Sequence, residues 1–216
     1  MSTPRPTTQA DQHSAEVARH YREHAPRVPV DGLEIFEIYP LTVQIEMEIG
    51  FGRGLFLLER AAAAPAAHML GLEIKSKLAC RLAERVEALS LPRIRVLTGD
   101  VRVVLPNVRP AAALTRVFMH FPDPWWKKRH SKRRVISEEV LDQVARLLRP
   151  GGEFFMQTDV EERAAEAVAQ LAAHPAFELS GTGYLDHNPY QAQSNRERRA
   201  VEDGVPIYRV LAVRRG

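Results

Sequence analysis

The sequence predicts an α/β fold in which a largely parallel sheet has helices on both faces and an antiparallel pair of strands closes one edge. Beyond residue 30, short apolar runs alternate with longer segments whose apolar residues recur at the helical period. Strands and helices that take turns along a chain build βαβ units with right-handed crossovers, and such units give parallel sheets. The last two apolar segments flank a polar, charged insertion at 186–204, and these segments predict the antiparallel pair.

The individual elements are expected where the pattern changes. Apolar runs predict five strands, over residues 44–49, 68–74, 93–97, 114–121 and 153–158. Helical periodicity predicts four helices, over residues 54–64, 76–90, 136–149 and 161–174. The third helix is expected to end before the fifth strand at Arg149, Pro150, Gly151 and Gly152. The two late strands are expected over residues 177–185 and 206–215.

The length of 216 residues suits one domain with one sizeable core. We expect this domain over residues 31–216, after a loosely ordered arm over residues 1–30 that is polar and rich in Pro, Thr and His. The single cysteine, Cys80, is expected to be a buried helical residue, and it excludes a disulfide framework. The eight His lack ligand spacing, so no metal is expected. The chain shows neither a signal peptide nor a long apolar run, and a reducing cytoplasm is the expected location.

A glycine-rich turn, EIGFGRG, follows the first predicted strand. In it Glu48 precedes Gly50 and Gly52, and a helix is expected directly afterwards. Glycine allows a positive φ and lets the backbone approach a ligand closely, so a ligand is expected over the carboxyl end of this strand. The second and third strands also lead to acids, Glu73 and Asp100, and Glu73 is well placed for two ribose hydroxyls. A tight turn with incidental carboxylates is the alternative interpretation.

Two cofactor classes suit this outline, namely dinucleotides and S-adenosylmethionine. The dinucleotide fingerprint has a third glycine where this chain has Leu55. Three carboxylates at consecutive strand ends would repel a pyrophosphate, and they favour a cationic sulfonium. An acid two residues before a G-x-G-x-G loop resembles the first motif of class I methyltransferases. This resemblance implies a Rossmann-like sheet of seven strands and places Asp100 near the adenine.

The fourth predicted strand leads into FPDPWWKKRHSKRR, residues 121–134. Pro122 and Pro124 restrict the backbone, and they are expected to hold Asp123 stiffly where a methyl group would leave. Although the formal net charge is only +3, basic residues crowd here, and they can neutralise the phosphates of a polyanionic partner. A solvated helix face is the alternative for some of them. Trp125 and Trp126 are candidates for stacking on a base, for the core, or for covering the loop.

The segment FPDPWWKKRHSKRRVI, taken with EIGFGRG, GLEIK and QTD, is similar to the bacterial tRNA (guanine-N7-)-methyltransferase family over roughly residues 44 to 213. The resemblance implies transfer of methyl from S-adenosyl-L-methionine to N7 of the variable-loop guanine of tRNA, position 46 in the usual tRNA count. The cofactor ligands that it implies are Glu48, Gly50, Gly52, Glu73, Asp100 and Asp123. Asp123 is also the implied catalytic residue.

The same resemblance implies where the tRNA binds. Its substrate contacts fall on Lys127 and Asp159, and the counterpart of a T-x-x-E motif places two more on Ser194 and Glu197. The segment implied for RNA binding comprises Arg129, His130, Ser131, Lys132, Arg133 and Arg134. Members of the family occur as monomers or homodimers, and either state is expected.

Two other functions compete with this one. A non-catalytic RNA-binding module on a methyltransferase fold would not need the acids Glu48, Glu73, Asp100 and Asp123. A methyltransferase for a small metabolite would not need the basic run after PDPWW. The arm over residues 1–30 is expected to be a flexible leader, and its His20, Arg22 and Arg27 leave a contact with RNA as the alternative.

Overall fold

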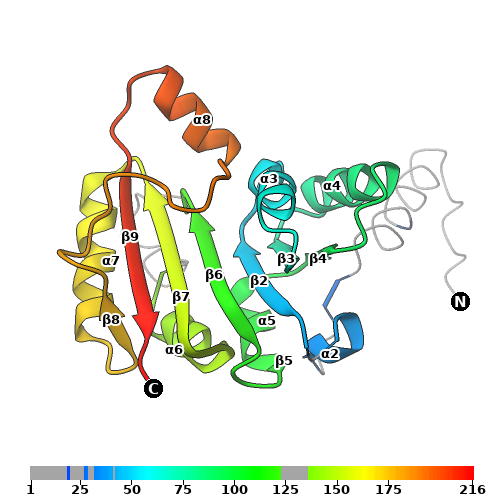
Figure 1. Ribbon diagram of the computed structural model, residues 1–216, viewed down its shortest axis with the longest axis horizontal. Coiled ribbons are helices and arrows are strands. Elements are labelled where there is room, and N and C mark those ends of the chain that lie inside the picture. Colours follow the sequence, from blue (N-terminus) through cyan, green and yellow to red (C-terminus); the bar gives the residue numbers. More distant parts are fainter. Residues whose placement is uncertain (1–18, 20–26, 29–31, 41, 123–135) are drawn as a thin grey trace, which may run out of the picture.

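The computed structural model describes residue 19 and residues 27–28, 32–40, 42–122 and 136–216. Its main sheet has seven strands in the order β4-β3-β2-β6-β7-β9-β8 (Figure 1). Five of them are parallel, namely β2 (Gln44–Ile49), β3 (Ala67–Glu73), β4 (Ile94–Thr98), β6 (Leu114–His120) and β7 (Leu148–Thr158). The strand β9 (Tyr208–Arg214) runs antiparallel to both β7 and β8 (Phe177–Leu179). The predicted parallel sheet with an antiparallel C-terminal pair is confirmed.

The direction of the chain through the sheet reverses between β2 and β6. From β2 the chain moves outward to β3 and β4, and it then returns to the other side of β2 to form β6 and β7. In open α/β sheets, ligands bind beyond the carboxyl ends of the strands at such a switch point. The topology therefore indicates where a ligand site should lie before any side chain is considered.

Helices cover both faces of the sheet. Successive side chains of a strand point to opposite faces, so Val117 and Met119 of β6 join one apolar cluster and Phe118 joins the other. The first cluster includes residues of α5 (Val101–Val104), α6 (Glu138–Leu147) and α7 (Glu161–Ala173). The second includes residues of α3 (Leu55–Ala63) and α4 (Ser76–Ala88), among them the buried Cys80. Among the described residues, this second cluster also includes Tyr190 and Ala192, which come from a loop.

Short elements complete the described part of the chain. The strand β1 (Leu33–Glu34) pairs with β5 (Val108–Arg109) in a small parallel sheet. The helix α2 (Ile35–Ile38) follows β1, and the 3-10 helix η1 (Leu105–Asn107) precedes β5. The helix α8 (Asn195–Glu202) lies before β9. Among the described residues, no helix combines the length and the apolar character that a membrane span requires.

Some boundaries differ from those that the sequence predicts. The helix α6 ends at Leu147 and β7 begins at once at Leu148, whereas the sequence predicts that the helix ends at residues 149–152 and that the strand begins at residue 153. Leu148 pairs with Leu114, and the register then shifts so that Glu153 pairs with Arg116. Gly151 lies in the stretch of β7 where the register shifts, and its φ of 74° is in the left-handed region, which glycine adopts easily. The strand is therefore longer than its apolar run.

The insertion at 186–204 contains α8, which the hydrophobic pattern did not predict. The helix is polar on most of its surface, so it lacks an apolar stripe. Its start is nevertheless encoded, because Ser194 is the N-cap and its hydroxyl accepts a hydrogen bond from the backbone N–H of Glu197 at 3.1 Å. The strand β8 is shorter than expected, since Gly181 and Gly183 both adopt positive φ soon after it.

Candidate active site

A cavity of about 910 Å³ lies at the switch point. Its walls come from the ends of β2, β3, β6 and β7, from the loop after β4, and from the start of α8. The predicted cofactor residues Glu48, Gly50, Gly52, Glu73 and Asp100 all line it. So do the predicted substrate residues Asp159 and Ser194. Segments more than 100 residues apart in sequence thus meet where the topology indicates a ligand site.

The turn between β2 and α3 leaves its backbone open to the cavity. Gly50 and Gly52 have φ of 72° and 59°, and a Cβ atom added at either would meet nothing within 4 Å. Gly54 is different, because its Cβ would lie 2.3 Å from Leu82. Gly54 therefore serves the packing of α3 on α4, whereas Gly50 and Gly52 form a cradle for a ligand.

Two of the acids are held in place by the backbone around them. The carboxylate of Glu73 accepts hydrogen bonds from the N–H of Gly52 at 3.0 Å and from the N–H of Lys75 at 2.9 Å. Asp100 is the N-cap of α5 and accepts from both the N–H and the Nε of Arg102, each at 3.0 Å. The side-chain hydrogen bond from Arg102 lowers the pKa of Asp100, with the backbone hydrogen bond adding to it and burial opposing it. Asp100 is thus kept ionised at the cavity wall.

Glu48 lines the cavity and is 1% exposed. Its Oε1 is 2.8 Å from Nδ1 of His120, which lies at the end of the neighbouring strand β6. The other carboxylate oxygen, Oε2, has no hydrogen-bond partner among the described residues. A buried carboxylate oxygen without a donor fits a site that a cationic ligand completes.

The substrate residues that the resemblance implies lie in two different settings. Asp159, just after β7, pairs with Arg196 of α8, whose Nε is 3.0 Å from Oδ2. Ser194 also lines the cavity, but Glu197 does not. Glu197 is 1% exposed and accepts hydrogen bonds from Gln157 at 2.8 Å, from Asn188 and from Arg209. Its position ties α8 to the sheet, and its contact with substrate stays a prediction.

Several predicted residues lie outside the described part of the chain. They are Asp123, Lys127, Arg129, His130, Ser131, Lys132, Arg133 and Arg134, together with Trp125 and Trp126. The chain enters this segment from Phe121 and Pro122, which line the cavity. The backbone N–H of Phe121 donates to the carbonyl of Gln157 at 2.7 Å, and its φ of 48° is unusual for a residue other than glycine.

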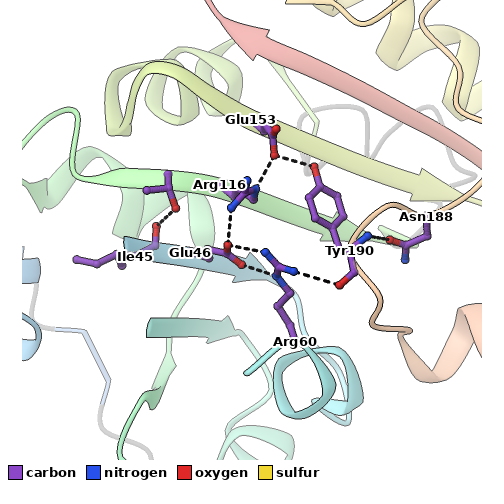
Figure 2. A network of polar contacts seen from close by, with 8 residues as sticks. Ile45, Glu46, Arg60, Arg116, Glu153, Asn188 and Tyr190 are labelled. Atoms are coloured by element: carbon purple, nitrogen blue, oxygen red, sulfur yellow. Dashed lines mark hydrogen bonds and ion pairs between the residues drawn. The ribbon is translucent and has the colours of Figure 1, made fainter. Parts of the chain in front are cut away.

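A buried polar network beneath the loop that leads to α8 was not predicted (Figure 2). The carboxylate of Glu46 accepts from Arg60 at 2.8 and 2.9 Å and from Arg116 at 2.8 Å. Arg60 also donates to the carbonyl of Tyr190, and the hydroxyl of Tyr190 donates to Glu153, both at 3.1 Å. Burial is the main cause that raises the pKa of Tyr190 far above its usual value, so the hydroxyl stays protonated and can donate.

This network anchors the loop before α8, in which Tyr190 precedes the N-cap Ser194 by four residues. The ring of Tyr190 meets Phe118 and Phe155 edge-on, with centroid distances of 4.8 and 5.0 Å. One sequence signal points to the network, namely a glutamate at position 46 inside a buried strand, which demands a partner. The sequence does not say which arginines those partners are.

The chain resembles known proteins over most of its length. A family described as "Putative methyltransferase" matches residues 43–210. A tRNA (guanine-N(7)-)-methyltransferase of Thermosynechococcus vestitus is 36% identical over 198 residues, which are 92% of this chain and 91% of that protein. Its counterpart in Microcystis aeruginosa is 34% identical over 204 residues, with 93% and 95% covered.

Solved structures agree on the fold. The 16S rRNA methyltransferase KamB has a TM-score of 0.60 at 14% identity, covering 98% of this chain and 96% of that one. A SAM-dependent O-methyltransferase from Thermotoga maritima has a TM-score of 0.52 at 17% identity, covering 84% and 64%. These likenesses confirm the predicted Rossmann-like class I methyltransferase fold. The sequence matches, at 34% identity or more over nine-tenths of the chain, go further, and the chain belongs to the tRNA (guanine-N(7)-)-methyltransferase family.

Proposed function

We propose that the cavity binds S-adenosyl-L-methionine and a guanine of tRNA side by side, and that the guanine is the one at position 46 of the variable loop. Membership of the family makes the chain an S-adenosyl-L-methionine-dependent tRNA (guanine-N7-)-methyltransferase. The observation that carries the site assignment is that Glu48, Glu73 and Asp100 line one cavity with the open glycine turn and with Asp159. Because tRNA is its substrate, we place the enzyme in the cytoplasm.

The residues present fit the cofactor. Gly50 and Gly52 leave room for close approach of a ligand to the backbone. Glu73 keeps acceptor capacity beyond its two backbone hydrogen bonds, so it can receive ribose hydroxyls. Asp100 stands at the next strand end, where the adenine would lie. When bound, the cofactor supplies an electrophilic methyl group on a sulfonium.

For this reaction the protein must align the guanine with the methyl group and place negative charge near the guanine ring. N7 of guanine has an in-plane lone pair and no proton, so methylation at N7 requires no general base there. The product ring is cationic, and a nearby carboxylate stabilises it as it forms. Asp159 lines the cavity, and we assign its carboxylate to the guanine. Asp123, which follows Pro122 outside the described residues, is proposed as the catalytic partner that orients the base.

The basic run supplies affinity for the tRNA backbone. The cations from Lys127 to Arg134 neutralise phosphates, which gives binding that weakens with salt and carries little sequence information. Ser194, at the cavity wall, adds a polar contact to the bound nucleotide. The acids that line the cavity thus serve the cofactor and the guanine, whereas the basic run at residues 127–134 serves the phosphates.

The test is methyl transfer from labelled S-adenosyl-L-methionine to a tRNA transcript, followed by mass mapping of N7-methylguanosine. We expect label in the variable loop, and none in a transcript with adenosine in place of guanosine 46. Label at another guanine would overturn the position, and an unlabelled wild-type reaction would overturn the activity. Asp123→Asn should lower turnover by more than it lowers cofactor affinity, with the two measured separately, and full turnover in that variant would refute the catalytic role of Asp123.

A further inference from the structure

Glu48 and His120 form a buried pair at the switch point of the sheet. They lie on the adjacent parallel strands β2 and β6, and their side chains are 1% and 2% exposed. Nδ1 of His120 is 2.8 Å from Oε1 of Glu48. The imidazole is fixed from its other side by Phe56, with ring centroids 4.2 Å apart. His120 has no role among the residues that the family resemblance implies.

Each member of the pair keeps one atom without a partner. Among the described residues, neither Oε2 of Glu48 nor Nε2 of His120 has a hydrogen bond, and both residues line the cavity. A carboxylate only accepts hydrogen bonds, so the close contact requires that Nδ1 of His120 donates. In the neutral ring with hydrogen on Nδ1, the other nitrogen is an acceptor. Oε2 of Glu48 is therefore an acceptor that requires a donor.

We propose that His120 is a positioning residue, which holds the Glu48 carboxylate so that its free oxygen receives the α-ammonium group of S-adenosyl-L-methionine. This inference rests on the proposed function, because it requires the cavity to bind that cofactor. An ammonium carries three N–H donors and a positive charge, so it satisfies acceptors on a carboxylate through strong, charge-assisted hydrogen bonds. The ribose hydroxyls have Glu73 as their expected partner on the neighbouring strand.

The test compares two ligands that differ only in the amino acid. S-adenosylhomocysteine and 5′-methylthioadenosine share the adenosine and the thioether sulfur, but only the first has the α-ammonium and α-carboxylate groups. Calorimetry measures both dissociation constants for the wild type and for His120→Phe, a change that keeps a ring against Phe56. We expect His120→Phe to weaken S-adenosylhomocysteine by about tenfold or more and to leave 5′-methylthioadenosine within about twofold.

Two further variants separate positioning from general damage to the pocket. The amide nitrogen of His120→Asn can replace Nδ1 as a donor, so this variant should recover a large part of the lost affinity. In a Glu48→Gln background, His120→Phe should add little to the loss, because His120 acts through Glu48. Equal weakening of both ligands, or an unchanged affinity for S-adenosylhomocysteine, would overturn the proposal. If the wild type binds neither ligand, the proposed cofactor site itself fails, which is a separate outcome.

Discussion

Glu46 and Arg60 form a two-pronged ion pair beneath the loop that carries the chain to α8, with the carboxylate of Glu46 fully buried and the guanidinium largely so. The same carboxylate binds Arg116, and Arg60 reaches on to the carbonyl of Tyr190 (Figure 2). The loop that leads to α8 is therefore anchored at Tyr190 by charged groups of the sheet and of α3. Removing one partner of such a group leaves the others buried without compensation.

Glu46→Ala should accordingly cost about 3–5 kcal/mol of unfolding free energy, since two arginines lose their shared partner. Urea unfolding followed by circular dichroism measures the change. The matched control is Asp203→Ala, which breaks the exposed pair with Arg199 on α8 and should cost about 1 kcal/mol or less. Similar losses in the two variants would show that the Glu46 network is no more important than a surface pair.

Asp100 gives a dependence on pH whose sign can be stated. Its folded-state pKa is lowered, mainly by the side-chain hydrogen bond from Arg102, so ionised Asp100 stabilises the fold above its unfolded pKa of about 4. That contribution is lost as the pH falls through the lower, folded value. Arg102→Met should raise the pKa of Asp100, which the carboxyl carbon resonance reports by NMR titration. Because both side chains are partly exposed, the effect on stability is modest.

The control removes the Asp100 carboxylate itself. In an Asp100→Asn background, which keeps an N-cap residue, Arg102→Met should shift the midpoint of acid unfolding less than it does in the wild type, because no carboxyl group is left at position 100 to titrate. An equal shift in the two backgrounds would show that the pH dependence does not come from Asp100.

Cys80 should be inert in the folded enzyme. Burial raises the pKa of its thiol to about 11, and the hydrogen bond to Glu84 acts in the same direction. At pH 8, only roughly one thiol in a thousand is then the reactive thiolate. Ellman's reagent should react slowly with the native protein and rapidly in concentrated guanidinium chloride. Because the chain has one cysteine, the released colour counts a single site. Rapid reaction of the native protein would contradict the burial of Cys80.

The sequence predicts the parallel sheet well because its strands are buried on both faces and read as apolar runs between turn residues. The strand β2 over residues 44–49 is an example, since it is followed directly by the glycine turn. The hydrophobic pattern does not predict the helix α8, because α8 contains few apolar residues. The cavity acids were predictable from their places at strand ends, as Glu73 and Asp100 show.

Other contacts of the site depend on tertiary structure alone. His120 and Glu48 are 72 residues apart, and they meet only because β6 returns beside β2. The motif implies a substrate contact for Glu197, but it gives no sign of the buried hydrogen bonds that its carboxylate accepts from Gln157 and Arg209. Local pattern thus locates the ends of strands, whereas strand order and loop path decide which side chains face one another.

The glycine cradle offers the sharpest test of the cavity. Gly52 and Gly151 both have left-handed φ, 59° and 74°, and a Cβ atom at either would meet nothing within 4 Å. Alanine at each position should therefore carry the same backbone penalty, about 1–2 kcal/mol of unfolding free energy. Only Gly52 lines the cavity, whereas Gly151 lies near the opposite end of the sheet, at the start of β7.

Gly52→Ala should consequently weaken S-adenosylhomocysteine by about tenfold or more, because its methyl group fills space that a ligand needs, while Gly151→Ala should bind normally. Urea unfolding and calorimetry on the same two samples separate the stability effect from the binding effect. Wild-type affinity in both variants would mean that the ligand does not approach the backbone at Gly52. An equal loss of affinity in both variants would trace the change to backbone strain, and the cradle would then have no part in binding.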